Sequence, residues 1–216
     1  MIRRASSAPF LLGASLALVP LGAWAQVLPD PAARLSTRDI SPADQARDTM
    51  NRYAECIMKT RPAAVRRALS RPDAVIPVEL AKIADGDCLM NGELRMNASL
   101  FRGAIFRAIY MRDFSHEPLP SAWGEAAMTA SANPLLTFAD CVVQLDPNNA
   151  RSFVLAKPAT PDERDAVANL SATLGRCVAP GDQVGFSKTV LQGALAEALY
   201  RRTEASAVAA EAAEVN

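Results

Sequence analysis

Apolar residues recur at helical spacing along most of the chain, and the clearest pattern lies between residues 100 and 109. The apolar positions there are Leu100, Phe101, Ala104, Ile105, Ala108 and Ile109. This spacing keeps one face of a helix apolar and places arginines on the other sides. A second stripe with the same spacing consists of Val190, Leu191, Ala194, Leu195, Ala198 and Leu199. The pattern therefore predicts two amphipathic helices, each facing a core.

Three shorter helices are predicted ahead of each stripe. In the first half they span about 42–58, 62–69 and 78–83. In the second half one carries Phe138, Cys141 and Val142, and the others span 147–155 and 160–174. Ser41 and Thr160 are side chains that commonly cap a helix start. Two short strands are also expected, Glu93–Met96 and Gln183–Phe186.

The two stripes belong to a longer internal repeat. Tyr53-Ala54-Glu55-Cys56 matches Phe138-Ala139-Asp140-Cys141, and 90 residues separate Gly103 from Gly193 and Tyr110 from Tyr200. We therefore expect a mainly α fold of two pseudo-symmetric, disulfide-stapled helical repeats, residues 41–114 and 135–203. A linker at 115–134 joins them. The stripe helices should pack together, and the two short strands could pair.

A glycine interrupts each stripe at the same place, at Gly103 and at Gly193. Glycine inside a helix costs about 1 kcal/mol relative to alanine, so its presence in both copies indicates a close neighbour. Close packing between helices is the favoured interpretation. A ligand that approaches the glycine is the alternative.

The first 25 residues have the features of a secretory signal peptide. Arg3 and Arg4 give a positive start, an apolar run follows, and Ala23-Trp24-Ala25 supplies a cleavage motif. Both the general secretory route and the twin-arginine route stay open. We expect residues 26–40 to form an extended lead-in and residues 204–216 to be an Ala- and Glu-rich tail, frayed or disordered.

Cleavage would leave 21 basic and 23 acidic residues. This balance argues against a nucleic-acid partner. No other apolar run is long enough to span a bilayer, so we expect no membrane span after cleavage. The sequence predicts a periplasmic or secreted protein whose partner is an unknown protein or small molecule.

All four cysteines would survive cleavage and enter an oxidising compartment. Four cysteines allow three pairings, and the repeat selects Cys56 with Cys88 and Cys141 with Cys177. A metal site is disfavoured because the cysteines are widely spaced and the only histidine, His116, lies in the linker. No cofactor is predicted.

Enzyme motifs such as G-x-S-x-G, H-E-x-x-H and the nucleotide-binding glycine loops are absent from the sequence. Glu55 and Asp140 precede the first cysteine of each repeat, so the internal symmetry could bring them together as in a two-carboxylate hydrolase. The favoured interpretation pairs each acid with an arginine of its own repeat. The expected partners are Arg102 or Arg112 for Glu55, and Arg201 or Arg202 for Asp140.

Tyr110 and Tyr200 occupy equivalent positions near the ends of the stripe helices. We expect each to pack its ring and to expose its hydroxyl to water, with a role in binding as the alternative. Glu197 adds a third acid near the expected seam between the repeats. If Glu55, Asp140 and Glu197 converged in one pocket, a hydrolase would be favoured.

The segments Phe138–Val143, Val184–Phe186 and Leu191–Arg201 resemble a pattern found in uncharacterised exported proteins of alphaproteobacteria. The first repeat departs from this pattern at Phe106-Arg107. The resemblance implies export and no known activity.

The favoured function is non-enzymatic binding or interaction in the cell envelope. A hydrolase that uses acids at the seam and a purely structural or dimer-forming protein are the alternatives. The candidate binding residues are Glu55, Arg102, Tyr110, Asp140, Glu197 and Tyr200.

Overall fold

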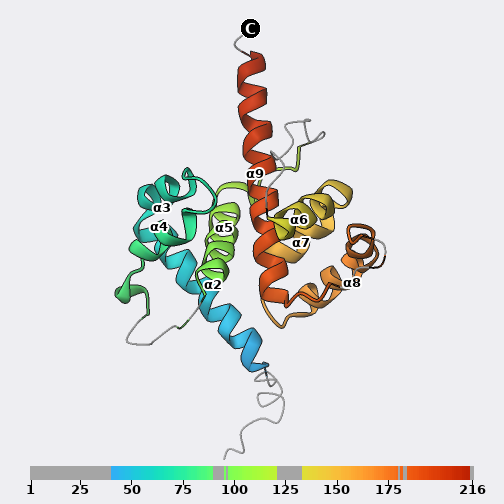
Figure 1. Cartoon of the computed structure of the whole chain (residues 1–216), viewed down its shortest axis with the longest axis horizontal. Coiled ribbons are helices and arrows are strands. Elements are labelled where there is room, and N and C mark those ends of the chain that lie inside the picture. Colours follow the sequence, from blue (N-terminus) through green and yellow to red (C-terminus); the bar gives the residue numbers. More distant parts are fainter. Residues whose placement is uncertain are drawn as a thin grey trace, which may run out of the picture. The chain divides into compact units, whose positions relative to one another are not determined.

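A computed structural model describes residues 40–89, 95, 97–120, 133–179, 181 and 184–214. Regular structure in this part of the chain is entirely helical (Figure 1). The α-helices are α2 (Pro42–Thr60), α3 (Pro62–Leu69), α4 (Ile76–Lys82), α5 (Ala98–Phe114), α6 (Pro134–Leu145), α7 (Pro147–Leu155), α8 (Pro161–Arg176) and α9 (Lys188–Glu214), and a 3-10 helix η1 spans Gly86–Leu89. The expected signal peptide, and the expected lead-in up to residue 39, lie outside the described residues.

Most helices begin where the sequence supplies a capping side chain. Ser41 accepts a hydrogen bond from the backbone N–H of Asp44 at the start of α2, and Thr160 accepts one from Glu163 at the start of α8. Asn97, Asn133 and Asp146 cap α5, α6 and α7 in the same way. Such caps satisfy backbone donors that have no partner inside the helix. The predicted helices are confirmed, with ends that differ by a few residues.

Helices α5 and α9 lie side by side at the centre of the fold and make its most extensive contact (Figure 1). Helices α2 and α4 pack on α5, whereas α6 and α7 pack on α9. Helix α3 contacts α2 and α4, and α8 contacts α7 and α6. In each half, two helices pack directly on the stripe helix and a third packs on those two. The predicted packing of the two stripe helices against each other is confirmed.

Gly103 and Gly193 meet at the closest approach of α5 and α9. A Cβ atom built on Gly103 would lie 2.7 Å from the Cα of Gly193, and one built on Gly193 would lie 2.8 Å from the Cα of Gly103. Any side chain at either position would overlap the backbone of the other helix. The prediction that the paired glycines mark close helix packing is confirmed.

Two disulfides staple the fold. Cys56–Cys88 ties α2 to η1, and Cys141–Cys177 ties α6 to the end of α8, each with a Cα–Cα distance of 5.8 Å. This is the pairing that the repeat selected. Each bridge lies within one half of the chain, and together they use all four cysteines. No disulfide therefore joins the two halves.

The predicted short strands are not confirmed. Residues 184–186 have no regular structure, and of Glu93–Met96 only Arg95 is described. The described residues contain no strand. A short strand without a partner gains little stability, and Val184 is 47% exposed instead of packed in a sheet.

Helix α5 differs from the amphipathic helix that its sequence predicts. Residues 101–110 are all buried, including Arg102 and Arg107, which were expected on outward sides. Neighbouring helices cover α5 on several sides, and both arginines find polar partners in the interior. The one-sided pattern was therefore a wrong guide to the burial of this helix.

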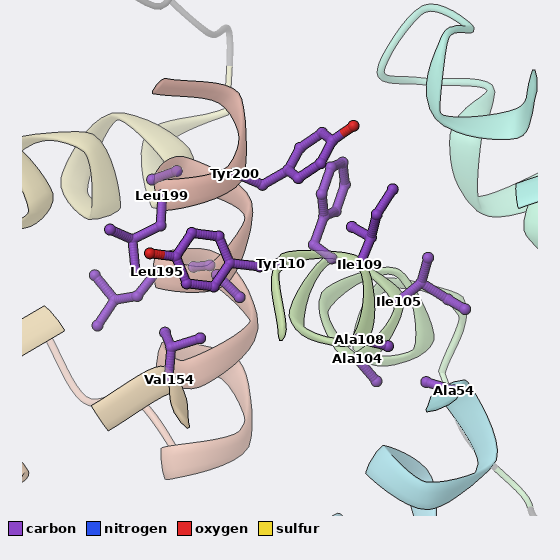
Figure 2. Close-up of a cluster of buried hydrophobic side chains, with 14 of the residues drawn as sticks. Ala54, Ala104, Ile105, Ala108, Ile109, Tyr110, Val154, Leu195, Leu199 and Tyr200 are labelled. Carbon is purple, nitrogen blue, oxygen red and sulfur yellow. The ribbon is translucent and has the colours of Figure 1, made fainter. Parts of the chain in front are cut away.

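Tyr110 corrects another expectation. Figure 2 shows its ring reaching from α5 toward Leu195 and Leu199 of α9. Its hydroxyl is buried and has no hydrogen-bond partner among the described residues, so it is not exposed to water as expected. Burial raises the pKa of this hydroxyl. The hydroxyl of the equivalent Tyr200 instead donates to Glu204 at 2.9 Å.

Helix α9 continues well beyond the second stripe. Its last described turns, up to Glu214, fall in the segment that was expected to be a frayed or disordered tail. Side chains from residue 207 to 213 are exposed, and Val208 is 61% exposed. The tail is therefore helical as far as Glu214, without a core of its own.

Candidate binding site at the seam of α5 and α9

An open pocket with a cavity volume of about 120 Å³ lies beside the paired glycines, where α5 and α9 meet. We call it the seam pocket. Its apolar lining consists of Pro77, Leu100, Gly103, Leu135, Leu136, Val190, Gly193 and Ala194. Its polar lining consists of Ser99, Arg102, Asn133, Thr189 and Glu197. A mainly apolar concave surface with a few polar groups is typical of a small-molecule site.

The two stripe helices contribute matched residues to the seam pocket. Ser99 and Thr189 lie four residues before the glycine of their helix, and Leu100 and Val190 lie three residues before it. Residues three and four apart share one face of a helix. The glycine, the aliphatic side chain and the hydroxyl of each helix therefore border the same space.

A buried ion pair forms the charged part of the lining. Arg102 of α5 donates from Nε to Glu197 of α9 at 2.9 Å, and a second guanidinium nitrogen bonds the other carboxylate oxygen. The side chain of Glu197 is 3% exposed and that of Arg102 is 11% exposed. This two-point geometry fixes the direction of both side chains. Loss of either partner would leave a charge buried without compensation.

Asp73, in the turn between α3 and α4, adds a second carboxylate to this pair. Its Oδ1 accepts a hydrogen bond from Arg102 at 3.1 Å and another from Arg201 of α9. Arg201 also lies 2.7 Å from Glu197. Burial by itself would raise the pKa of Asp73, but hydrogen bonds and charge from Arg201, followed by those of Arg102, hold it below its ordinary value.

The ring of Phe106 contacts both arginines of this group. The guanidinium carbons of Arg102 and Arg201 lie 5.7 and 5.6 Å from the centre of its ring. Such cation–π contacts restrict the position of a guanidinium without consuming its hydrogen-bond donors. The two arginines, two carboxylates and one ring form a cluster that we call the arginine cluster (Arg102, Arg201, Asp73, Glu197 and Phe106).

A second polar group crosses the helix interface elsewhere. Arg107 of α5 and Gln192 of α9 both donate to the backbone oxygens of Val154 and Ala156. These carbonyls lie at the C-terminal end of α7. Burial lowers the pKa of Arg107, an effect that the charge of Glu55 opposes. This group has no lining residue in common with the seam pocket.

The three acids expected to decide the chemistry do not converge. Glu55 pairs with Arg107 at 3.1 Å, which corrects the expected pairing with Arg102 or Arg112. Asp140 pairs with Arg202, as expected. Glu197 lines the seam pocket, whereas Glu55 lines a different pocket next to Met58 and Met111. Each of these three acids lies beside its own arginine, so the three do not form a two-carboxylate site with one another.

The sequence predicted only some of the residues that form the seam pocket and the arginine cluster. Arg102 and Glu197 were candidate residues, and the glycines indicated the packing. The ion pair between Asp73 and Arg201 could not be predicted from local spacing, since 128 positions separate the two residues. Tyr110 and Tyr200 lie in the helix interface but do not line the seam pocket; Tyr200 borders a neighbouring pocket with Arg201.

Another buried ionic group joins the ends of α2, α8 and α9. Glu163 is fully buried and pairs through Oε1 with Arg47, whose own side chain is 1% exposed. Its Oε2 accepts from the backbone N–H of Ala159 at 3.0 Å and from Lys188 at 3.2 Å. Burial by itself would raise the pKa of Glu163, but the bonds from Arg47 and Ala159 and the charge of Arg47 lower it.

The depressed pKa values predict a stability that falls in acid. Asp44, Asp73 and Glu163 each have a folded-state pKa below the ordinary value. A group of this kind stabilises the fold fully above its unfolded pKa, near 4, and loses that contribution as the pH falls through the folded pKa. Urea unfolding should give a free energy that is flat from about pH 7 to 5 and then falls.

The Glu163→Gln variant supplies the control for this acid series. It removes one titrating group and keeps the side-chain shape. Its free energy of unfolding should fall less steeply between about pH 5 and 3 than that of the wild type. Equal slopes for the two proteins would contradict the assignment of Glu163 as a stabilising carboxylate.

Within the described residues, no group of three or more His, Cys, Asp or Glu side chains is placed to hold a metal ion. The described helices also include none that is long and apolar enough to cross a membrane. No protein-family model, curated protein or solved structure matches the chain.

Proposed function

We propose that this protein is exported and binds a small molecule in the seam pocket without transforming it. The observation that carries the proposal is the pocket itself. It lies beside the two glycines at which α5 and α9 approach each other, and matched residues of α5 and α9 line it. Aliphatic walls with a hydroxyl from each helix suit a compact ligand that has an apolar body and a polar end.

Export is supported by the covalent structure. Two disulfides with all cysteines paired are typical of proteins that mature outside the reducing cytosol. The signal-peptide pattern in residues 1–25 and the resemblance to exported alphaproteobacterial proteins support the same compartment, periplasmic or secreted. The paired glycines and the two equivalent disulfides also support our proposal that the chain is an internal duplication.

The two alternatives have less support. A hydrolase at the seam needs converging carboxylates, and Glu55, Asp140 and Glu197 each lie beside an arginine instead. A dimer-forming protein needs an exposed apolar face on a stripe helix. On the described part of α5 and α9, Val208 is the single large apolar side chain that is strongly exposed.

Filling the seam pocket should abolish ligand binding. Val190 is a half-buried part of the wall, so Val190→Trp would place an indole in the space. A suitable probe is hexanamide, which has an aliphatic body for the walls and an amide for Ser99 and Thr189. In NMR titrations of the isotope-labelled wild type, we expect shifts centred on the amides of Gly103 and Gly193.

The matched control is Val208→Trp, which adds the same ring to an exposed position on the same helix. Val208→Trp should bind hexanamide like the wild type, whereas Val190→Trp should show no response. The proposal fails if hexanamide causes no shifts in the wild type at millimolar concentrations, or if the shifts persist in Val190→Trp.

A further inference from the structure

The arginine cluster holds the carboxylate of Asp73 next to Arg102, a lining residue of the seam pocket. Arg102 and Arg201 both bond the same oxygen of Asp73. We propose that the natural ligand is a small organic carboxylate, whose carboxylate group takes the place of the Asp73 side chain between Arg102 and Arg201. This inference rests on the proposed function, because the apolar body of the ligand would occupy the seam pocket.

The two carboxylates of the cluster differ in how easily they could be replaced. The side chain of Glu197 is 3% exposed and lies in the middle of α9. The side chain of Asp73 is 43% exposed and lies in the turn between α3 and α4. A solute can therefore reach the Asp73 position, whereas Glu197 is a fixed part of the wall.

The turn would stay in place when the carboxylate leaves. Arg102 also donates to the backbone oxygen of Asp73 at 2.8 Å. That hydrogen bond does not involve the side chain and can persist with a ligand bound. Displacement therefore needs a rotation of one short side chain instead of an opening of the fold.

Charge favours a monoanion at this position. Arg102 and Arg201 carry two positive charges, and Glu197 and Asp73 carry two negative charges. When the Asp73 carboxylate swings into solvent, the remaining three groups have a net positive charge. A carboxylate accepts two hydrogen bonds from guanidinium groups in one plane, so it matches the donors that Asp73 releases.

Arg201 has a donor to spare. Its Nε is buried and has no hydrogen-bond partner among the described residues. A buried donor without a partner costs free energy, so a ligand that supplies an acceptor gains affinity. Asp73 supplies an acceptor to Arg201 through another nitrogen, so a ligand carboxylate that bridged both nitrogens would add one hydrogen bond.

The arginine cluster and the seam pocket share two residues. Arg102 and Glu197 belong to both the cluster and the pocket lining, and Pro77, four residues after Asp73, lines the pocket as well. A ligand with its carboxylate at the arginines can therefore extend its apolar part toward Leu100 and Val190.

Asp73→Ala is the direct test, with hexanoate and hexanamide as a matched pair of probes. An internal carboxylate competes with the ligand at an effective concentration in the millimolar range or above. Its removal should raise the affinity for hexanoate by at least about tenfold and leave the affinity for hexanamide unchanged. Isothermal titration calorimetry or NMR titration gives both constants. Arg201→Gln in the Asp73→Ala background should remove the gain.

Two further variants control for fold and charge. Asp73→Asn keeps the size of the side chain and removes its charge, so it serves if Asp73→Ala loosens the turn, and it should also favour hexanoate. Asp165→Ala makes the same charge change at a 71% exposed position on α8 and should have no effect. The inference is overturned if Asp73→Ala and the wild type bind hexanoate equally, or if hexanamide gains as much.

These measurements separate the two proposals. One outcome is that hexanamide and hexanoate bind the wild type equally, Val190→Trp abolishes the binding of both, and the Asp73 variants change neither affinity. The seam pocket is then supported as a binding site, and the proposal of a carboxylate ligand is overturned. If neither probe binds any variant, the seam pocket falls as well.

Discussion

Replacing Gly103 with valine is expected to lower the free energy of unfolding by more than about 4 kcal/mol. The first added carbon alone would lie 2.7 Å from the Cα of Gly193, and the obstacle is backbone that cannot rotate away. Helices α5 and α9 must then separate, which loosens the largest helix contact of the fold. Chemical denaturation followed by circular dichroism measures the loss.

Gly175→Ala is the matched control. Gly175 lies in α8, and a Cβ atom there would meet nothing within 4 Å. The variant should equal the wild type or gain up to about 1 kcal/mol, because alanine is the better helix former. If Gly103→Val unfolds at the same denaturant concentration as the wild type, the close approach of α5 and α9 is wrong.

Replacing Glu163 with alanine should cost about 3 to 5 kcal/mol. The change leaves the side chain of Arg47 buried with Asp44 as its remaining ionic partner. It also takes the acceptor from the backbone N–H of Ala159 and from Lys188. Removing one member of a buried pair is costly mainly because the other charge stays behind without compensation.

Two comparisons test this reason against a simple loss of volume. The double variant Arg47→Met with Glu163→Met removes both charges and should recover most of the stability. Asp48→Ala breaks an exposed pair with Arg52 and should change the free energy of unfolding by less than about 0.5 kcal/mol. A double variant as unstable as Glu163→Ala alone would contradict the electrostatic explanation.

Local features of the sequence were enough to predict the helices. Caps such as Ser41 and Thr160 act on neighbouring residues, so they are visible in any short window. The internal repeat added long-range information. It selected the cysteine pairing and marked Gly103 and Gly193 as positions of close packing. The structure adds that the two glycines, 90 positions apart, contact each other.

The failures concern interactions that depend on several elements at once. The apolar stripe of α5 did not show that helices would cover its other sides too, so Arg102 and Arg107 appeared to be surface residues. The partner of Glu55 was sought among the wrong arginines for the same reason. The predicted strand at Gln183–Phe186 is not confirmed at residues 184–186, because alternation over four residues says nothing about a pairing partner.

The candidate site also combines residues on elements that the sequence predicts with a contact that only the packing reveals. Arg102, Glu197 and the glycines lie on the stripe helices, which the sequence predicts. Asp73 lies in a turn outside the motifs that define the repeat, so its position beside Arg201 follows only from the three-dimensional packing. The pocket volume likewise depends on how far α4 and α6 stand from the seam.

The most direct test of the central claim is native mass spectrometry of the chain purified gently from the cells that make it. The wild type should carry a non-protein mass at a one-to-one ratio, with both disulfides intact. Val190→Trp, prepared in parallel, should be bare, and Val208→Trp should retain the ligand. A bare wild type, or an equal added mass on Val190→Trp, would contradict a ligand in the seam pocket.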